Sequence, residues 1–322
     1  MANLYGYNPP VWLRNGHLQT VLPAIFRRVN GVFYERERIQ TPDDDFLDLD
    51  WSGSGEKLLA ILSHGLEGNS RRTYIKGMVK ALNQSHIDCL AWNYRTCSGE
   101  MNRKLRMYHN GCTDDLDLVI RYAISKGYEN IILIGFSMGG NISLLYLGQQ
   151  SEQTLPQVKG AVTFSVPIDL EDSAKQLAHW SNTIYMKRFL LSFHQKLKEK
   201  KALFPDLIDI RDYDRIKDFM TYDDRYTAPL HGFKNALDYY TKCSCGPLLE
   251  NIRVPSLIVN AKDDPFLGTS CYPIHQTANP DIHWEVPKYG GHVGFIELFN
   301  NGQYWSESRG VGFIREHISD VL

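Results

Sequence analysis

The fold of this chain is decided by residues 131–141, which read IILIGFSMGGN. An unbroken apolar run is typical of a buried parallel strand, and this one stops at a Gly-x-Ser-x-Gly unit centred on Ser137. A segment with helical apolar spacing follows it. Side chains at Gly135 and Gly139 would collide with the strand or the helix, whereas glycines permit a strained turn that lifts the serine hydroxyl clear of the sheet. The stretch predicts a nucleophile elbow; the plainer alternative is a glycine-rich turn whose serine only caps the helix.

Size and composition are those of one globular α/β domain. The 322 residues are 43% hydrophobic and 22% charged, so we expect a single domain over 1–322 that carries an insertion. The 35 basic and 37 acidic residues give a formal charge of -2. No global field would draw the chain to nucleic acid or to an anionic membrane, so we expect no nucleic-acid partner.

The cysteines and the longest apolar runs indicate in which cellular compartment the protein is expected. Six scattered cysteines in a chain of this length indicate reduced thiols rather than a disulfide framework. Cys243-Ser-Cys245 resembles half of a metal site, but no second ligand pair accompanies it, and we expect neither metal nor cofactor. The first residues lack a signal-peptide pattern, and no apolar run is long enough for an integral membrane segment. We therefore expect a cytoplasmic protein.

Strands and helices are expected to alternate along most of the chain, which predicts a mostly parallel sheet with helices on both faces. A hairpin of 32–40 and 46–51 should open it. Further strands are expected at 58–62, 89–93, 158–166, 254–260 and 283–286, and helices at 74–84, 113–126, 236–240 and 305–322.

Residues 168–233 break this alternation, because they show helical spacing and no convincing strand. We expect an inserted helical cap there. One interpretation places Phe189, Phe193 and Leu197 over an acyl pocket, with the lysines nearby (Lys196, Lys198, Lys200, Lys201) facing water or a lipid surface. The other is an amphipathic helix that packs on the core and exposes a solvated lysine face.

The N-terminal segment 8–28 predicts a loop and a short helix that packs on the domain. An interfacial amphipathic anchor is the alternative, because Val21, Leu22, Ile25 and Phe26 precede Arg27-Arg28. Two adjacent charges are weak support for it.

A serine nucleophile needs a base beside it and a carboxylate behind that base. In this type of fold the chain order is serine, acid, histidine, with the last two on loops after late strands. Ser137, Asp264 and His292 satisfy that order, and glycines around His292 allow its loop to approach the elbow. Asp263 is the rival acid, and we favour Asp264 because Pro265 fixes the turn after it. The rival bases, His275 and His283, lie in a polar helix-like segment and inside a strand.

The first buried strand runs into His64-Gly65-Leu66-Glu67-Gly68-Asn69. Small residues just past a strand end let backbone N–H groups point at a ligand. We expect the amides of Leu66 and Met138 to form an oxyanion hole, and His64 to shape the loop through a backbone hydrogen bond.

These motifs together resemble the YheT-like hydrolases, a group of the α/β-hydrolase superfamily that also includes the eukaryotic ABHD esterases and lipases. Arg95-Thr96 departs from the Arg-Gly that is common there, and the N-terminal membrane anchor of the eukaryotic members is not expected here. The matching pieces are Asn15-Gly16-His17-Leu18-Gln19-Thr20, His64 to Gly68, Asn93-Tyr94-Arg95, Gly135 to Asn141, Tyr222 to Phe233, Asp263 to Phe266 and Gly290 to Phe295.

The resemblance assigns Ser137, Asp264 and His292 to the family's catalytic triad. The expected activity is hydrolysis of a small-molecule carboxylic ester through an acyl-enzyme, with an acyl lipid as one candidate substrate. A thioesterase or an acyltransferase on the same scaffold, and a binding module without turnover, are the alternatives.

Overall fold

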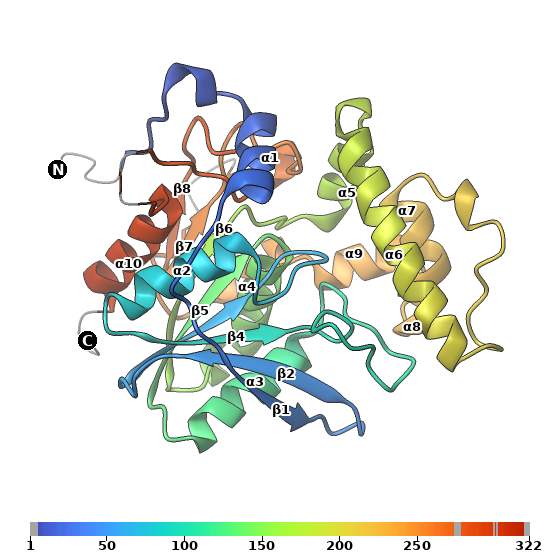
Figure 1. Cartoon of the computed structure of the whole chain (residues 1–322), viewed down its shortest axis with the longest axis horizontal. Coiled ribbons are helices and arrows are strands. Elements are labelled where there is room, and N and C mark those ends of the chain that lie inside the picture. The colour runs from blue at the N-terminus through green and yellow to red at the C-terminus, as the bar shows by residue number, and fades with distance from the viewer. Residues whose placement is uncertain (1–5, 274–277, 299, 301, 319–322) are drawn as a thin grey trace.

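The computed structural model describes residues 6–273, 278–298, 300 and 302–318, and shows a central sheet covered by helices (Figure 1). The strands of this part are β1 Glu35–Gln40, β2 Phe46–Ser52, β3 Leu58–Ser63, β4 Asp88–Asn93, β5 Asn130–Phe136, β6 Val158–Phe164, β7 Ser256–Val259 and β8 Ile282–Glu285. The α-helices are α1 Gly16–Phe26, α2 Thr73–Asn83, α3 Thr113–Ser125, α4 Met138–Gln150, α5 Leu170–Ala178, α6 Thr183–Leu203, α7 Phe219–Tyr222, α8 Ala228–Leu230, α9 Ala236–Cys243 and α10 Trp305–His317.

The described strands form one sheet in the order β1-β2-β4-β3-β5-β6-β7-β8. β2 is antiparallel to both of its neighbours, and every pair from β4 to β8 is parallel. The predicted opening hairpin and mostly parallel sheet are therefore confirmed. Ser63 is paired with Gly135, and Phe136 with Phe164, so the carboxyl ends of β3, β5 and β6 meet at one edge. Loops that leave this edge share one region of the molecule.

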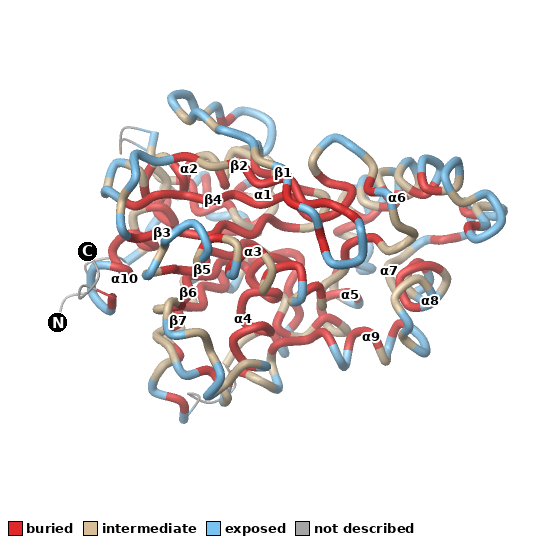
Figure 2. Tube along the Cα trace, turned by 90° about the horizontal axis from the view of Figure 1, so that it is seen from below, coloured by how far each residue is buried: buried red, intermediate tan, exposed pale blue. Residues whose placement is uncertain are grey.

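Both faces of the sheet are buried, as the unbroken apolar run of β5 predicts. Ile131 and Leu133 join the apolar cluster of α3 and α4, whereas Ile132 and Ile134 join that of α2 and α10. This alternation follows from the two-residue period of a strand. Figure 2 shows the buried residues running along the strands through the middle of the molecule.

Helices α5 to α8 follow β6 and project to one side of the sheet, at the right of Figure 1. They have an apolar cluster of their own, which includes Leu190, Phe193 and Leu197 of α6. The expected helical character of 169–233 is confirmed for this segment. Its division from the rest as a cap over 168–233 stays a prediction.

The expectation that the lysines of α6 face solvent or lipid is wrong for two of them. Lys200 is fully buried, and its ammonium group donates to the side-chain oxygen of Asn102 at 2.6 Å. Lys196 lies 2.7 Å from Glu67 as a largely buried ion pair. A buried ammonium group needs such partners, and they come from loops that are distant in sequence. Lys198 is exposed as expected.

The predicted N-terminal helix is confirmed as α1. The side chain of Asn15 caps it by accepting from the Leu18 amide at 3.0 Å. Gln19 and Pro23 are buried against the domain, whereas Ile25 and Phe26 are 52% and 70% exposed.

No helix in the described ranges is both long and apolar enough to cross a membrane. The six cysteines are buried and free, including Cys243 and Cys245. No described group of three or more His, Cys, Asp or Glu side chains could hold a metal ion.

Candidate active site

The turn between β5 and α4 has the strained geometry that its glycines predict. Ser137 has a φ of 53°, in the left-handed region that side chains rarely adopt. A Cβ atom at Gly139 would lie 2.1 Å from the Ser63 carbonyl oxygen, and one at Gly135 would lie 2.5 Å from the Cα of Gly140. The two glycines thus let the helix start directly against β3 and β5. The serine is held at the carboxyl edge of the sheet, before the N-terminus of α4.

The structure brings three of the predicted site residues into one hydrogen-bonded line. The Ser137 hydroxyl oxygen lies 2.8 Å from Nε2 of His292. Nδ1 of the same ring lies 2.9 and 3.0 Å from the two carboxylate oxygens of Asp264. The Asp264 side chain is fully buried, and its Oδ1 also accepts from the Phe266 amide at 2.9 Å. The carboxylate is thereby fixed behind the imidazole, which faces the serine.

Asp263, the rival acid, contacts the same loop but not the imidazole. Its Oδ1 accepts from the Gly291 amide at 2.9 Å, and its Oδ2 is buried without a hydrogen-bond partner among the described residues. Burial raises the pKa of this carboxyl above its ordinary value. Asp263 therefore shapes the backbone before His292, whereas Asp264 orients the ring.

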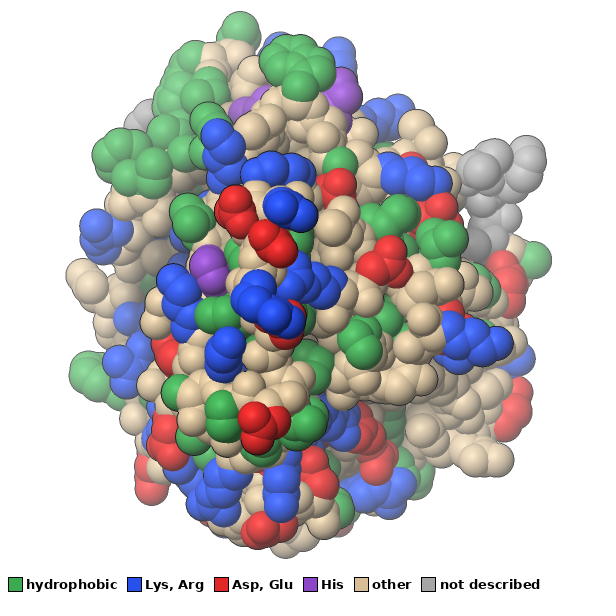
Figure 3. All heavy atoms as spheres, turned by 90° about the vertical axis from the view of Figure 1, so that its right-hand side faces the viewer, with side chains coloured by type: hydrophobic (Ala, Val, Ile, Leu, Met, Phe, Trp, Pro, Cys, Tyr) green, Lys and Arg blue, Asp and Glu red, His purple; other side chains and the backbone are tan. Residues whose placement is uncertain are grey.

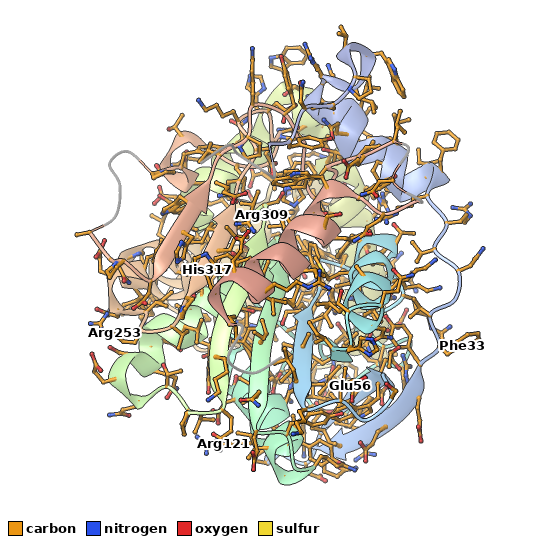
Figure 4. The ribbon with its side chains drawn as sticks, turned by 90° about the vertical axis from the view of Figure 1, so that its left-hand side faces the viewer. Phe33, Glu56, Arg121, Arg253, Arg309 and His317 are labelled. Carbon is orange, nitrogen blue, oxygen red and sulfur yellow. The ribbon has the colours of Figure 1, made fainter. Side chains whose placement is uncertain are left out.

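The rival bases do not approach the serine. His283 lies on β8, and its ring contacts Phe313 edge-on and His317 at a tilt, at centroid distances of 5.2 and 4.3 Å. Figure 4 labels His317 on that helix. His275 lies outside the described residues.

The histidine loop is held by the N-terminal segment, a role that the sequence did not reveal. The Thr20 hydroxyl accepts from the His292 amide at 2.9 Å and donates to the Gly16 carbonyl at 2.7 Å. The side-chain oxygen of Gln19 accepts from the Ile296 amide at 3.1 Å. A Cβ at Gly291 would lie 2.4 Å from the Gly16 carbonyl oxygen, so the two segments touch through glycine. The motif around Gly16 and Thr20 matched the family pattern, but its spacing did not indicate that it would contact the histidine loop.

The loop after β3 lies beside the elbow, since a Cβ at Gly65 would be 3.2 Å from the Cβ of Ser137. Within the described residues, neither the Leu66 nor the Met138 amide has a protein acceptor. His64 is fully buried, and its Nδ1 lies 2.8 Å from the Gly65 carbonyl oxygen. Burial lowers the pKa of His64 to about 3, so the ring is neutral and shapes the loop, as predicted.

The loop that departs from the common Arg-Gly pattern lies near this region. Thr96 has a φ of 71°, a conformation that glycine adopts without strain. Arg95 is buried, and its guanidinium group pairs with Asp115 at 2.8 Å and with Asp43 at 2.7 Å. Neither residue contacts Ser137, Asp264 or His292.

A cavity of about 700 Å³ opens from Ser137 and His292 toward helices α5 to α7. Leu66 and Met138 lie on its wall beside them. Apolar side chains from four helices and the loop after β7 also line it: Val21, Ala24, Ile25, Leu170, Ala174, Leu177, Ile184, Tyr185, Phe189, Phe193, Phe219 and Phe266. Phe189 and Phe193 thus face the pocket, as one interpretation of α6 predicted, whereas Leu197 is buried in the helical core.

One part of the cavity wall is polar and was not foreseen. The rings of His109 and His231 are in tilted contact at a centroid distance of 4.5 Å, and burial lowers the pKa of both. Asp223 is half-buried on the same wall and accepts from the Tyr240 hydroxyl at 2.7 Å. Burial raises the pKa of this carboxyl to about 7. These residues come from separate loops and helices, which is why no motif joined them.

Comparison with known proteins identifies the family of this chain. The family described as alpha/beta hydrolase fold matches residues 61–298. YheT of Escherichia coli (strain K12) is 35% identical over 92% of this chain and 88% of its own length, and the phospholipase ABHD3 of Mus musculus is 30% identical over 90% and 73%. Among solved structures, the Pyrococcus furiosus esterase PF2001 covers 91% of this chain and 96% of its own with a TM-score of 0.58, and at 18% identity that likeness concerns the fold. The chain belongs to the α/β-hydrolase family, in the group that contains YheT.

Proposed function

We propose that this chain cleaves carboxylic esters with Ser137 as nucleophile, His292 as general acid and base, and Asp264 as the residue that orients His292. The observation that carries the proposal is the line of hydrogen bonds from Ser137 through His292 to Asp264. The relatives support the general class of activity. They are named for phospholipase and lipase activity, so the chain is an esterase- or lipase-type hydrolase.

In the first half of the reaction, Nε2 of His292 takes the hydroxyl proton while the serine oxygen attacks the ester carbonyl. The Leu66 and Met138 amides donate to the oxyanion that develops, and the buried Asp264 carboxylate stabilises the imidazolium. His292 then returns the proton to the departing alcohol. A water molecule repeats the sequence on the acyl-enzyme and releases the acid.

The cavity supports an ester with a sizeable apolar group. Its wall is mostly aromatic and aliphatic, and its volume is that of a pocket for a ligand of drug or lipid-fragment size. We propose an acyl ester, which includes acyl lipids, as the substrate class. The segment 168–233 would act as the cap that forms the roof of this pocket, and a cytoplasmic location is part of the same proposal.

The test is Ser137→Ala, assayed with a p-nitrophenyl ester and compared with the wild type by thermal unfolding. We expect turnover to fall to background with the unfolding temperature unchanged, because Ala removes one hydroxyl that no core contact needs. Turnover retained by the variant would contradict the assignment.

A fluorophosphonate probe separates an enzyme from a binding module. A covalent adduct on Ser137 is expected in the wild type and in no Ser137→Ala sample, since the probe reacts with an activated serine. An unlabelled wild type would favour the binding module. Acyl thioesters and added alcohol acceptors, given to the same protein, would reveal thioesterase or acyltransferase activity.

A further inference from the structure

Exposed apolar side chains surround the mouth of the cavity. Ile25 of α1 and Ile184 of α6 line the cavity and are nevertheless 52% and 81% exposed, so they mark where it opens to solvent. Further large apolar side chains on α1, on α6 and on the 3-10 turn 180–182 just before α6 are also exposed. We call the whole set the rim, and it consists of Leu18, Ile25, Phe26, Trp180, Ile184 and Leu191.

The two halves of the rim lie next to each other. Nδ1 of His17 on α1 is 3.1 Å from the Tyr185 hydroxyl on α6, and the two rings stack at 7°. Leu18 and Ile184 adjoin these two residues in sequence. Seven-residue spacing places Leu18 and Ile25 on one face of α1, and Ile184 and Leu191 on one face of α6. The rim is therefore one apolar surface rather than scattered residues.

The two segments that carry the rim contain basic but no acidic side chains. The described residues 6–34, which contain α1, include no Asp or Glu, and neither do residues 173–198, although the chain has 37 acidic residues. Exposed basic side chains accompany the rim: Arg14, Arg28, Lys187 and Arg188. Figure 3 shows hydrophobic side chains gathered along the top and upper left of the molecule, with basic side chains next to them. This local excess exists despite a net charge of -2.

We propose that the rim docks on the surface of an anionic lipid bilayer, with the mouth of the cavity facing the lipid. Large apolar side chains at the border of a basic patch fit the boundary between head groups and acyl chains, and the basic groups complement anionic lipid. The contact that we propose is interfacial. An acyl ester could then reach Ser137 without crossing water. The docking itself needs no turnover, so it stands or falls independently of the proposed chemistry.

The experiment is sedimentation of the full chain with vesicles of phosphatidylcholine alone or with about one-third phosphatidylglycerol. We expect the wild type to bind the anionic vesicles more tightly, with an affinity that falls as salt rises. Phe26→Ser/Trp180→Ser should weaken that binding by about tenfold or more, because both side chains lose apolar burial in the lipid. Neither residue lines the cavity. Lys187→Gln should weaken binding to anionic vesicles by about fivefold and leave binding to neutral ones unchanged.

The matched control is Leu203→Ser/Leu207→Ser. These residues are 53% and 63% exposed, but they lie at and beyond the other end of α6, about 28 Å along the helix from Ile184. Binding equal to that of the wild type is expected. The proposal is overturned if the wild type does not sediment with anionic vesicles, or if the Phe26/Trp180 and Leu203/Leu207 variants bind alike. Thermal unfolding of each variant shows that the fold is intact.

Discussion

Replacing Asp264 by Asn tests how the proposed base is oriented. The Phe266 amide donates to Oδ1 at 2.9 Å, so an Asn side chain would keep its oxygen there and place its NH₂ group at the Oδ2 position. That position lies 2.9 Å from Nδ1 of His292. Because an NH₂ group can only donate, Nδ1 must accept, and the ring proton moves to Nε2. A protonated Nε2, 2.8 Å from the Ser137 hydroxyl, cannot take the serine proton.

The wrong tautomer, together with the loss of the negative charge behind the imidazolium, predicts a fall in kcat of about 10³–10⁴, or about 4–5.5 kcal/mol of activation free energy. The volume of the side chain is unchanged, so the fold should be retained. The assay is initial-rate hydrolysis of p-nitrophenyl acetate, with circular dichroism to confirm folding and fluorophosphonate labelling to report the reactivity of Ser137.

The neighbouring Asp263→Asn variant is the control. Its remaining oxygen can still accept from the Gly291 amide, and the change removes a half-buried charge. We expect kcat within about tenfold of the wild type, with stability at neutral pH unchanged or higher. The reasoning fails if Asp264→Asn keeps more than about a tenth of the activity, or if Asp263→Asn is the more damaging change.

Three further predictions concern stability. Asp223→Asn should raise the free energy of unfolding relative to the wild type, by an amount that grows from about pH 4 to pH 7 and reaches up to about 4 kcal/mol. The reason is that the carboxyl has a pKa of about 7 in the folded protein and therefore loses its proton at a higher pH than in the unfolded chain. Urea unfolding of both proteins at about pH 5 and pH 8 measures the difference, and an equal difference at the two pH values would contradict the prediction. Thr20→Val should cost about 1–3 kcal/mol of unfolding free energy and lower kcat, since the His292 amide loses its acceptor, whereas Thr20→Ser should restore both; equal denaturation midpoints would argue against the contact. Gly139→Ala should cost about 4 kcal/mol or more, because its Cβ would meet the Ser63 carbonyl oxygen at 2.1 Å; a soluble variant with the wild-type unfolding temperature would be contrary evidence.

The sheet and the elbow were predictable because local sequence determines them. An apolar run such as 131–134 that ends at a Gly-x-Ser-x-Gly unit is typical of a doubly covered strand, and the glycines around Ser137 reflect contacts that such a turn must make. The order of Ser137, Asp264 and His292 along the chain was equally informative, since the topology of the sheet brings their loops to one edge. The choice between Asp263 and Asp264 depended on a single proline, and the geometry favours the same residue.

Contacts between distant segments could not be predicted in this way. The hydrogen bond between Thr20 and His292 joins residues 272 positions apart. Neither residue type indicates in the sequence which residue it will contact. Lys196 and Lys200 looked like solvent-facing residues of an amphipathic helix, because their acceptors Glu67 and Asn102 lie on other loops. The polar wall around Asp223 and His231 combines loops and helices in the same manner. Burial of a charged group depends on tertiary packing, which the spacing of apolar residues along the sequence does not predict.

The contact between Thr20 and the histidine loop also bears on how this domain is delimited. The family match begins at residue 61, whereas Thr20, which binds the His292 amide, lies 41 positions before that point. A polypeptide shortened to the matched region would keep its serine, acid and base and yet lose the support that aligns the base. Proteolytic cleavage between α1 and β1 would release the same support. The alignment of His292, near the C-terminal end of the chain, therefore depends on an intact N-terminal segment.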